Sequence, residues 1–348
     1  MARKPARPAG ARDTLLIDLA LQGGGSHGAF TWGVLDRLLE EDWIEIEAAS
    51  GTSAGAMNAA VLAHGLLAGG ADGARDALAR FWKKVSDAAA MSPLKRGPLD
   101  VLLGRWTLDT SPAYLAMDIA TRIFSPYDLD FGMPNPLAAI LADVVDFDRL
   151  PQSPVKLFIT ATNVHTGRPR VFRNHDVSPA ALMASACLPM MFQAVEIDGQ
   201  AYWDGGYSGN PTMTPLIDEC VSDDTIIIGI NPVQRPGVPK SARDILNRLN
   251  EVAFNAVLLK ELQMMALLRS VADAGNEKTA HWARMRVHLV QSALLAELGA
   301  SSKLNAEWDF LTMLRDEGRR AAEAFLAQHR DALGKRSTLP IEYLLEKV

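Results

Sequence analysis

The stretch LLIDLALQGGGSHG, residues 15–28, decides the fold class of this chain. Residues 15–21 form a short apolar run that leads directly into glycines, which is typical of a buried β-strand ending in a tight turn. Behind the turn, residues 29–40 carry apolar side chains at helical spacing. A strand, a glycine turn and a helix in this order predict the first unit of an α/β fold.

Strand and helix signals continue to alternate after this unit. Strands are expected at residues 44–49, 156–162, 195–203, 225–230 and 286–289, and helices at 53–67, 241–272 and 303–333. Residues 86–136 contain repeated prolines and are expected to form an insertion of loops and short helices. The alternation predicts a three-layer α/β fold, in which helices cover both faces of a mostly parallel central sheet.

The composition excludes several classes of protein. Hydrophobic residues make up 48% of the 348 residues, which is enough for a sizeable core and disfavours a disordered chain. The net charge of −6 disfavours nucleic-acid binding, which needs a basic face. Two cysteines are too few for a disulfide framework and form no metal-binding pattern. We find no signal peptide and no apolar run of membrane-spanning length, so we expect a cytoplasmic protein.

The glycine turn at residues 23–28 allows two functional interpretations. Glycines let backbone N–H groups face a ligand, and the N-terminus of the following helix favours an anion. The pattern fits the dinucleotide-binding GxGxxG motif, with Glu47 near the place of its acidic residue. It also fits an oxyanion hole, whose N–H groups stabilise the negative oxygen of a tetrahedral intermediate.

A candidate nucleophile lies in Gly51-Thr52-Ser53-Ala54-Gly55, which matches the GxSxG elbow. The elbow requires a sharp turn between a strand and a helix, with small residues around the serine. Both elements are expected here, and the flanking residues are small. The dinucleotide interpretation leaves this segment unexplained.

A serine hydroxyl needs a base, and none of the seven histidines lies in an obvious catalytic loop downstream of Ser53. Asp198-Gly199 is a hairpin signal, and the return strand ends in Asp204-Gly205-Gly206. Two glycines after an acid allow its carboxylate to approach another part of the backbone, although a simple second turn would have the same pattern.

Together the three sites resemble the patatin-like phospholipases. That family has a GGG loop for the oxyanion, a GxSxG serine, and an Asp-Gly-Gly or Asp-Gly-Ala motif that supplies the base, and it needs no histidine. Residues 184–189, ASACLP, are similar to the family's Ala-Ser-x-x-x-Pro stretch, and the resemblance covers about residues 14–231. Many members carry Arg or Lys after the glycine triplet. Here Ser26-His27 stands there, which leaves open whether His27 acts as a cation.

The resemblance implies an acyl hydrolase in which Ser53 attacks an ester carbonyl and Asp204 takes its proton. It implies that backbone N–H groups hold the oxyanion, that four glycines support the motifs, and that no metal or cofactor is needed. The implied oxyanion residues are Gly23, Gly24, Gly25, Ser26 and Gly28, and the supporting glycines are Gly51, Gly55, Gly205 and Gly206.

The resemblance also implies a lipid or other acyl-ester substrate and a transient contact with a membrane surface; the oligomeric state stays open. The alternatives are an esterase or depolymerase acting on non-phospholipid esters, a nucleotide-binding module using Gly23–Gly28, and a catalytically silent scaffold.

Three segments are expected: a disordered basic tail at 1–13, a patatin-like catalytic domain at 14–240, and a mainly helical extension at 241–348 packed on the same domain. In the extension, the apolar stripe of helix 241–272 favours core packing or a subunit contact, with a lid or lipid-docking surface as the alternative. The stripe consists of Ile245, Leu249, Val252, Leu259 and Leu262.

Overall fold

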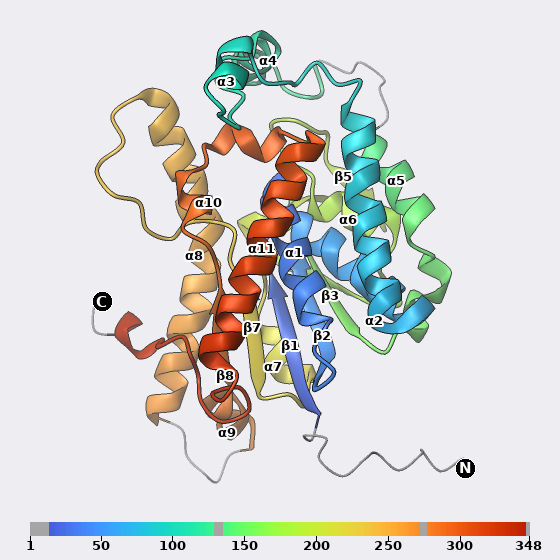
Figure 1. Ribbon diagram of the computed structural model, residues 1–348, viewed down its shortest axis with the longest axis vertical. Helices are drawn as coiled ribbons and strands as arrows, with labels where there is room; N and C mark the ends of the chain where they lie inside the picture. The colour runs from blue at the N-terminus through green and yellow to red at the C-terminus, as the bar shows by residue number, and fades with distance from the viewer. Residues whose placement is uncertain (1–13, 129–134, 272–276, 346–348) are drawn as a thin grey trace.

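The computed structural model describes residues 14–128, 135–271 and 277–345. The expected basic tail at 1–13 lies outside the described residues. The described chain forms a central eight-stranded sheet with helices on both of its faces (Figure 1).

The sheet is mixed, with its parallel strands in the centre and at one edge. The strand order is β5-β6-β3-β2-β1-β7-β8, and β4 also pairs with β3. The parallel strands are β1 (Leu15–Leu21), β2 (Ile44–Thr52), β3 (Lys156–Asn163), β7 (Asp224–Ile228) and β8 (Arg286–Val290). The antiparallel strands, at the other edge, are β4 (Pro169–Arg173), β5 (Val195–Ile197) and β6 (Gln200–Asp204). The prediction of a mostly parallel sheet is confirmed, and β4 is an addition to it.

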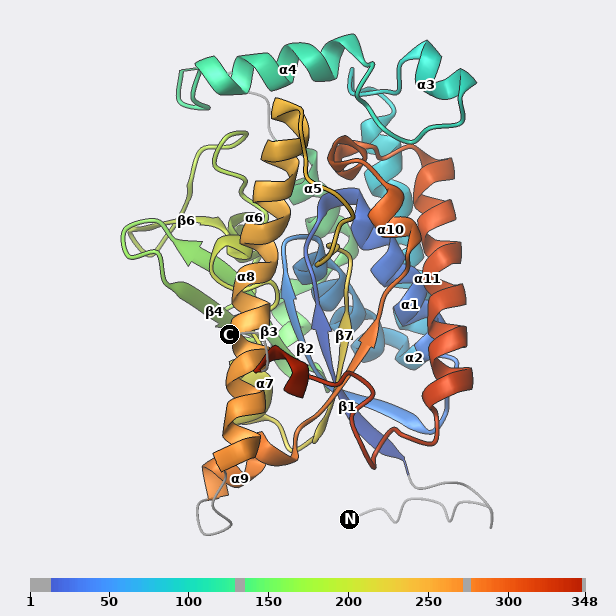
Figure 2. The same cartoon turned by 90° about the vertical axis from the view of Figure 1, so that its left-hand side faces the viewer.

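Three layers are visible in Figure 2, with the sheet between two groups of helices. One face packs on the larger core cluster, which includes α1 (Gly28–Leu38), α2 (Ala54–Ala89), α5 (Pro136–Val144), α6 (Pro179–Ser185) and α11 (Trp308–His329). The other face packs on α7 (Thr214–Glu219) and α8 (Ala242–Val271). Smaller helices are α9 (Glu277–Arg284) and α10 (Leu294–Glu297), and short 3₁₀ turns are η1 (Gly25–His27), η3 (Gly205–Tyr207) and η4 (Ala300–Leu304).

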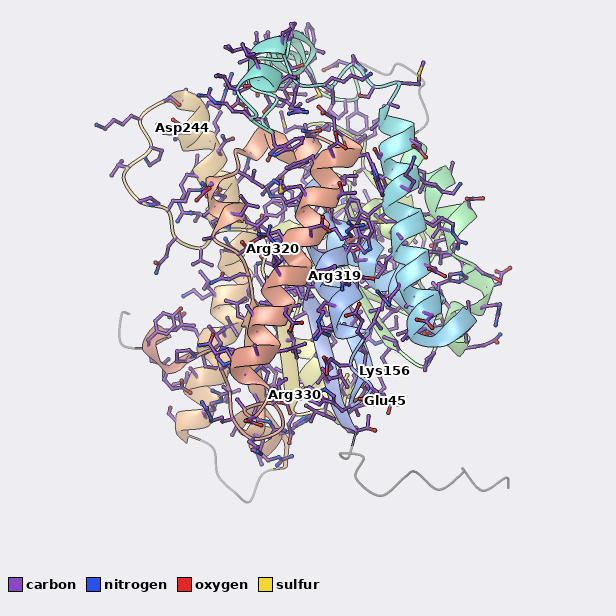
Figure 3. The ribbon with its side chains drawn as sticks, in the orientation of Figure 1. Glu45, Lys156, Asp244, Arg319, Arg320 and Arg330 are labelled. Atoms are coloured by element: carbon purple, nitrogen blue, oxygen red, sulfur yellow. The ribbon has the colours of Figure 1, made fainter. Side chains whose placement is uncertain are left out.

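Helices α1 and α11 touch backbone to backbone. A Cβ at Gly33 of α1 would lie 1.9 Å from the carbonyl oxygen of Arg315, and a Cβ at Gly318 of α11 would lie 2.1 Å from that of Phe30. Only glycine fits at such distances. Arg319, labelled in Figure 3, adds ion pairs from α11 to Asp36 of α1 and to Glu40 just after it. The C-terminal part of the chain is therefore fixed on the first helix of the fold.

Helix α2 is the one helix of the described chain that is long and apolar enough to span a membrane by length and composition. Sequence analysis found no run of that length, because α2 reaches it through small residues rather than through a continuous apolar run. Its apolar window is 61% buried inside the protein, as in a core helix. The helix is also kinked at Gly69 and Gly70.

Helix α8 divides into two halves with different surroundings. Leu262 of the predicted stripe is buried in the core, together with its neighbours Leu258 and Met265. Ile245 and Leu249, nearer the start of the helix, are 44% and 58% exposed. The prediction of core packing is therefore correct only for the C-terminal half, because no described element covers the N-terminal half of the stripe.

The proline-rich insertion forms α3 (Pro98–Leu102) and α4 (Pro112–Ile123), which lie beyond the end of the sheet toward which β1 points (Figures 1 and 2). Helix α4 contains no buried residue. Exposed apolar side chains of this insertion are Leu99, Val101, Leu102, Leu103, Ile119, Ile123, Phe124 and Tyr127.

Candidate active site

Ser53 lies in a strained turn between the end of β2 and the start of α2. Its backbone has φ 55° and ψ −122°, a conformation that non-glycine residues rarely adopt. The flanking glycines are needed for close packing, because a Cβ at Gly51 would lie 2.5 Å from the carbonyl oxygen of Gly55, and one at Gly55 would lie 2.1 Å from that of Leu21. The local structure thus has the sharp strand–turn–helix geometry that the GxSxG motif requires.

Asp204 ends β6 and is buried, with 1% of its surface exposed. Its Oδ1 accepts a hydrogen bond from the Gly206 N–H at 2.7 Å. Burial raises the pKa of this carboxyl to about 7, while the Gly206 N–H, the Ser53 hydroxyl and the charge of Lys303 act in the opposite direction. Asp204 is therefore a far stronger base than a solvent-exposed aspartate.

The Ser53 hydroxyl is close enough to influence the pKa of Asp204, yet Asp204 Oδ2 has no hydrogen bond of ordinary geometry to any described residue. The structure therefore brings together two side chains that lie in separate motifs of the sequence, with one oxygen of Asp204 on the side of the Ser53 hydroxyl free of any other hydrogen bond to the described residues.

The turn after Asp204 is held against its neighbours by both glycines. A Cβ at Gly205 would lie 2.1 Å from the carbonyl oxygen of Thr160, and one at Gly206 would lie 2.3 Å from the ring of Phe254. Ser185, in the segment ASACLP, links the parts of the site. Its hydroxyl accepts the Ser53 N–H at 2.9 Å and donates to the Thr160 carbonyl at 2.7 Å.

The glycine loop lies directly against the elbow, since a Cβ at Gly23 would be 2.7 Å from the Cβ of Ser53. The Gly23 N–H already donates to Asn210 Oδ1 at 2.6 Å, and the Gly28 N–H donates to carbonyl oxygens of η1. An oxyanion role for Gly23 and Gly28 would have to displace these hydrogen bonds. The remaining candidate donors lie between them, in Gly24–Ser26, at the start of a helical segment where N–H groups lack helical partners.

His27 is buried beneath the loop and bonds Ser302 Oγ through its Nε2 at 2.8 Å. Burial, together with the positive charges of Lys303 and Arg235, lowers the pKa of this imidazole well below its usual value. His27 is therefore neutral at pH 7 and does not supply a cation to the glycine loop.

A cation that no sequence motif indicates lies beside the loop. Lys303, in η4, places its Nζ 2.7 Å from Asn231 Oδ1, and its backbone carbonyl packs so tightly on Gly25 that a Cβ there would lie 2.3 Å from the oxygen. No sequence motif marks this lysine, because it lies far from the glycine loop in the sequence, with strands β2 to β8 between them. Asn210 and Asn231, which hold the loop, were missed for the same reason.

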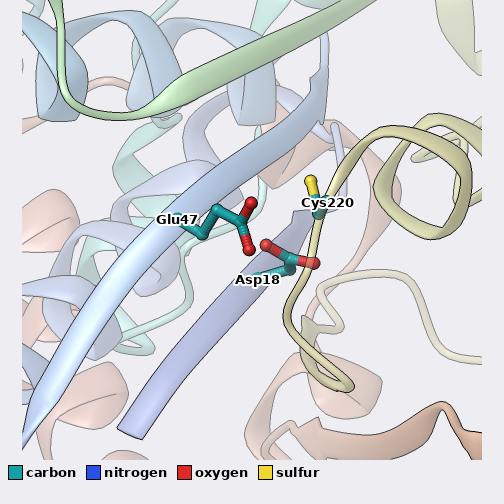
Figure 4. A group of neighbouring side chains, drawn as sticks. All are labelled: Asp18, Glu47 and Cys220. Carbon is teal, nitrogen blue, oxygen red and sulfur yellow. The ribbon is translucent and has the colours of Figure 1, made fainter. Parts of the chain in front are cut away.

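In the described chain, the group of side chains that could hold a metal ion consists of Asp18, Glu47 and Cys220. Their potential donor atoms lie within 4.8 Å of one another (Figure 4). A register shift in the pairing of β1 with β2 makes Glu47 an extra residue of β2. Glu47 already accepts hydrogen bonds from the Lys156 ammonium and from two backbone N–H groups. The group therefore already holds a cation, Lys156.

These contacts also decide against the dinucleotide interpretation. Its acidic residue should stand at the end of the second strand, free to meet a ribose. Glu47 lies within β2, which continues to Thr52, and its carboxylate is engaged by Lys156, Val221 and Ser222.

A three-layer α/β fold with a strained serine elbow and a buried carboxyl beside it has the form of a hydrolase site. The chain belongs to the patatin-like phospholipase family, whose model it matches over residues 19–217. Membership of this family supports lipid acyl hydrolase activity, of the esterase or lipase kind.

Two solved structures are similar to this chain. VipD from Legionella pneumophila is 14% identical, with a TM-score of 0.40, and the similarity covers 92% of this chain and 68% of that one. The heterodimeric complex ExoU-SpcU from the type III secretion system of Pseudomonas aeruginosa is 21% identical, with a TM-score of 0.32, and the similarity covers 96% of this chain and 68% of that one. No curated protein matches the sequence.

Proposed function

We propose that the protein hydrolyses carboxylic ester bonds of lipids through a Ser53–Asp204 dyad. The observation that carries the proposal is the position of Ser53 in a strained elbow beside a buried aspartate whose pKa is raised to about 7. A base works best when its pKa is near the working pH. Much of it is then deprotonated and ready to accept a proton, yet it still binds the serine proton firmly enough to remove it.

In this mechanism Ser53 Oγ attacks the ester carbonyl as Asp204 takes its proton. The carbonyl oxygen becomes negative and is held by N–H groups of Gly24–Ser26. When the tetrahedral intermediate collapses, the C–O bond breaks and Asp204 returns the proton to the leaving alkoxide. Asp204 then takes a proton from a water molecule that attacks the acyl-enzyme, and it returns this proton to Ser53 Oγ as the acyl C–O bond breaks and the carboxylic acid leaves. Negative charge moves between Asp204 and the oxyanion, so no new buried ion pair forms at any step.

A lipid substrate is supported by the insertion that carries α3 and α4. Its apolar side chains are exposed at the end of the sheet where β2 delivers Ser53. Several large apolar side chains exposed close together in the sequence are consistent with a surface that meets a partner or a lipid phase. We propose that it contacts acyl chains or a membrane surface.

The experiment is to compare three variants on one water-soluble p-nitrophenyl ester and on defined phospholipid vesicles. Ser53→Ala and Asp204→Asn should each reduce kcat by about a thousandfold or more, because each removes one half of the dyad while keeping its shape. His27→Ala should keep measurable turnover, since the neutral imidazole bonds Ser302. A fluorophosphonate probe should label the peptide that contains Ser53.

The opposite pattern refutes the dyad. If His27→Ala is as inactive as Ser53→Ala while Asp204→Asn keeps its turnover, the base is the histidine. If the wild-type protein hydrolyses no ester of any chain length and the probe labels nothing, the protein is a silent scaffold.

A further inference from the structure

Lys303 reaches the glycine loop by two routes. Its Nζ donates to Asn231 Oδ1 at 2.7 Å, and Asn231 Nδ2 donates to the Gly23 carbonyl at 2.7 Å. Its own carbonyl packs on Gly25, whose φ of 59° no side chain would adopt easily. The lysine therefore fixes both ends of the Gly23–Gly25 turn, one through its side chain and one through its backbone.

The same ammonium acts electrostatically on the base. The positive charge of Lys303 lowers the pKa of Asp204, and the negative charge of Asp204 raises that of Lys303. Burial of the ammonium outweighs this attraction and lowers its pKa to about 8. Lys303 is thus a cation at neutral pH, close enough to interact with the aspartate that gives up its charge during catalysis.

The other charged groups around Lys303 are engaged with one another. On α8, Glu251 forms ion pairs with Arg235 and Arg248. Glu251 raises the pKa of Lys303, whereas Arg235 lowers it. His27, which also faces the lysine from η1, is neutral. Of the groups that shift the pKa of Asp204, Lys303 is the one that acts through its net charge. The Gly206 N–H and the Ser53 hydroxyl act through hydrogen bonding.

We propose that Lys303 is a positioning residue for ester hydrolysis, which holds the oxyanion loop through Asn231 and supplies the positive charge that the loop itself lacks. This inference rests on the proposed Ser53–Asp204 chemistry. During attack, negative charge leaves Asp204 and appears on the substrate oxygen at the loop. A fixed cation near both stabilises the charge before and after the transfer, and it does so in a site from which much of the water is excluded.

The test compares pH–rate profiles of Lys303→Gln, Lys303→Arg and the wild-type protein on the soluble ester, with the exposed Lys335→Gln as a control for net charge. The wild-type profile should rise through the pKa of Asp204 near 7 and fall as Lys303 deprotonates near 8. Lys303→Gln keeps a donor for Asn231 but not the charge. It should lower kcat by about tenfold with little change in KM, lose the alkaline limb and move the acid limb to higher pH.

Lys303→Arg should restore kcat without the alkaline limb, because a guanidinium does not titrate in this range. Lys335→Gln should behave as the wild-type protein. A Lys303→Gln variant with the wild-type kcat and both limbs overturns the proposal, and so does a loss of kcat with an unshifted profile, which marks a purely structural role. Failure of the dyad is recognised separately, since Ser53→Ala would then remain active in the same assay.

Discussion

Asp18→Asn should stabilise the protein relative to the wild type, and this advantage should grow as the pH rises. Asp18 lies in the middle of β1 with no exposed surface, and neither carboxyl oxygen has a hydrogen bond of ordinary geometry to a described residue, although the Cys220 thiol is close enough to lower its pKa. Burial, followed by the negative charge of Glu47, raises the pKa of this carboxyl from 3.8 to about 8. The folded protein therefore holds a proton that the unfolded chain releases near pH 4.

The sign of the effect follows from this difference. A group whose folded pKa is raised contributes stability that is fully present below its unfolded pKa and is lost as the pH rises through its folded pKa. For Asp18 the window runs from pH 3.8 to about 8. At 1.36 kcal/mol per pKa unit, the loss between pH 5 and pH 8 is about 4 kcal/mol. Asparagine has nearly the same shape and releases no proton in this window, so it avoids the loss.

The assay is urea unfolding at several pH values between 5 and 8, with the free energy of unfolding extrapolated to water. The difference between Asp18→Asn and the wild-type protein should grow with pH in favour of the variant. The exposed Asp42→Asn serves as the control and should show no such growth. A difference that stays constant from pH 5 to pH 8 would refute the assignment of a proton to Asp18.

Two further predictions concern surfaces away from the dyad. Gly318→Ala should separate α11 from α1, because the added Cβ would lie 2.1 Å from the Phe30 carbonyl; we expect a lower Tm and faster proteolysis within the C-terminal segment, and an unchanged Tm would contradict the close contact. Ile119→Asp combined with Ile123→Asp should reduce liposome binding and phospholipid turnover but spare the soluble ester, since α4 contributes no buried side chain; equal binding by a folded variant would exclude α4 as the lipid-contacting surface.

The central part of the fold was predictable because its signals are local. The run 15–21 and the glycines behind it specify a strand and a turn within a few residues, and the structure places β1 at Leu15–Leu21. Strand β4 was missed because Pro169–Arg173 is short and begins and ends with residues that do not mark a strand. The boundary of α2 was missed because two glycines at its kink look like the end of a helix.

The residues of the candidate site also divide into those that a local motif predicts and those that no motif predicts. Ser53 and Asp204 stand in contiguous motifs, whose glycines are required because an added Cβ would lie 2.1–2.5 Å from a neighbouring atom. Lys303 and Asn231 have no such motif, because their role arises from packing between distant elements. The exposed half of the α8 stripe shows the same limit, since periodicity gives the apolar face of a helix but not the neighbour that covers it.

The contact of Gly33 with Arg315 has a consequence for folding during synthesis on the ribosome. Helix α1 cannot pack on α11 until that helix is made, about 280 residues later in the sequence. At 5–20 residues per second, synthesis of this interval takes roughly a quarter of a minute to a minute. Lys303 emerges in the same late interval, shortly before α11. Throughout that time the elbow serine exists without the segment that fixes its glycine loop. A growing chain would therefore carry Ser53 before its loop is fixed, and the proposed ester cleavage would begin only after η4 and α11 have been made.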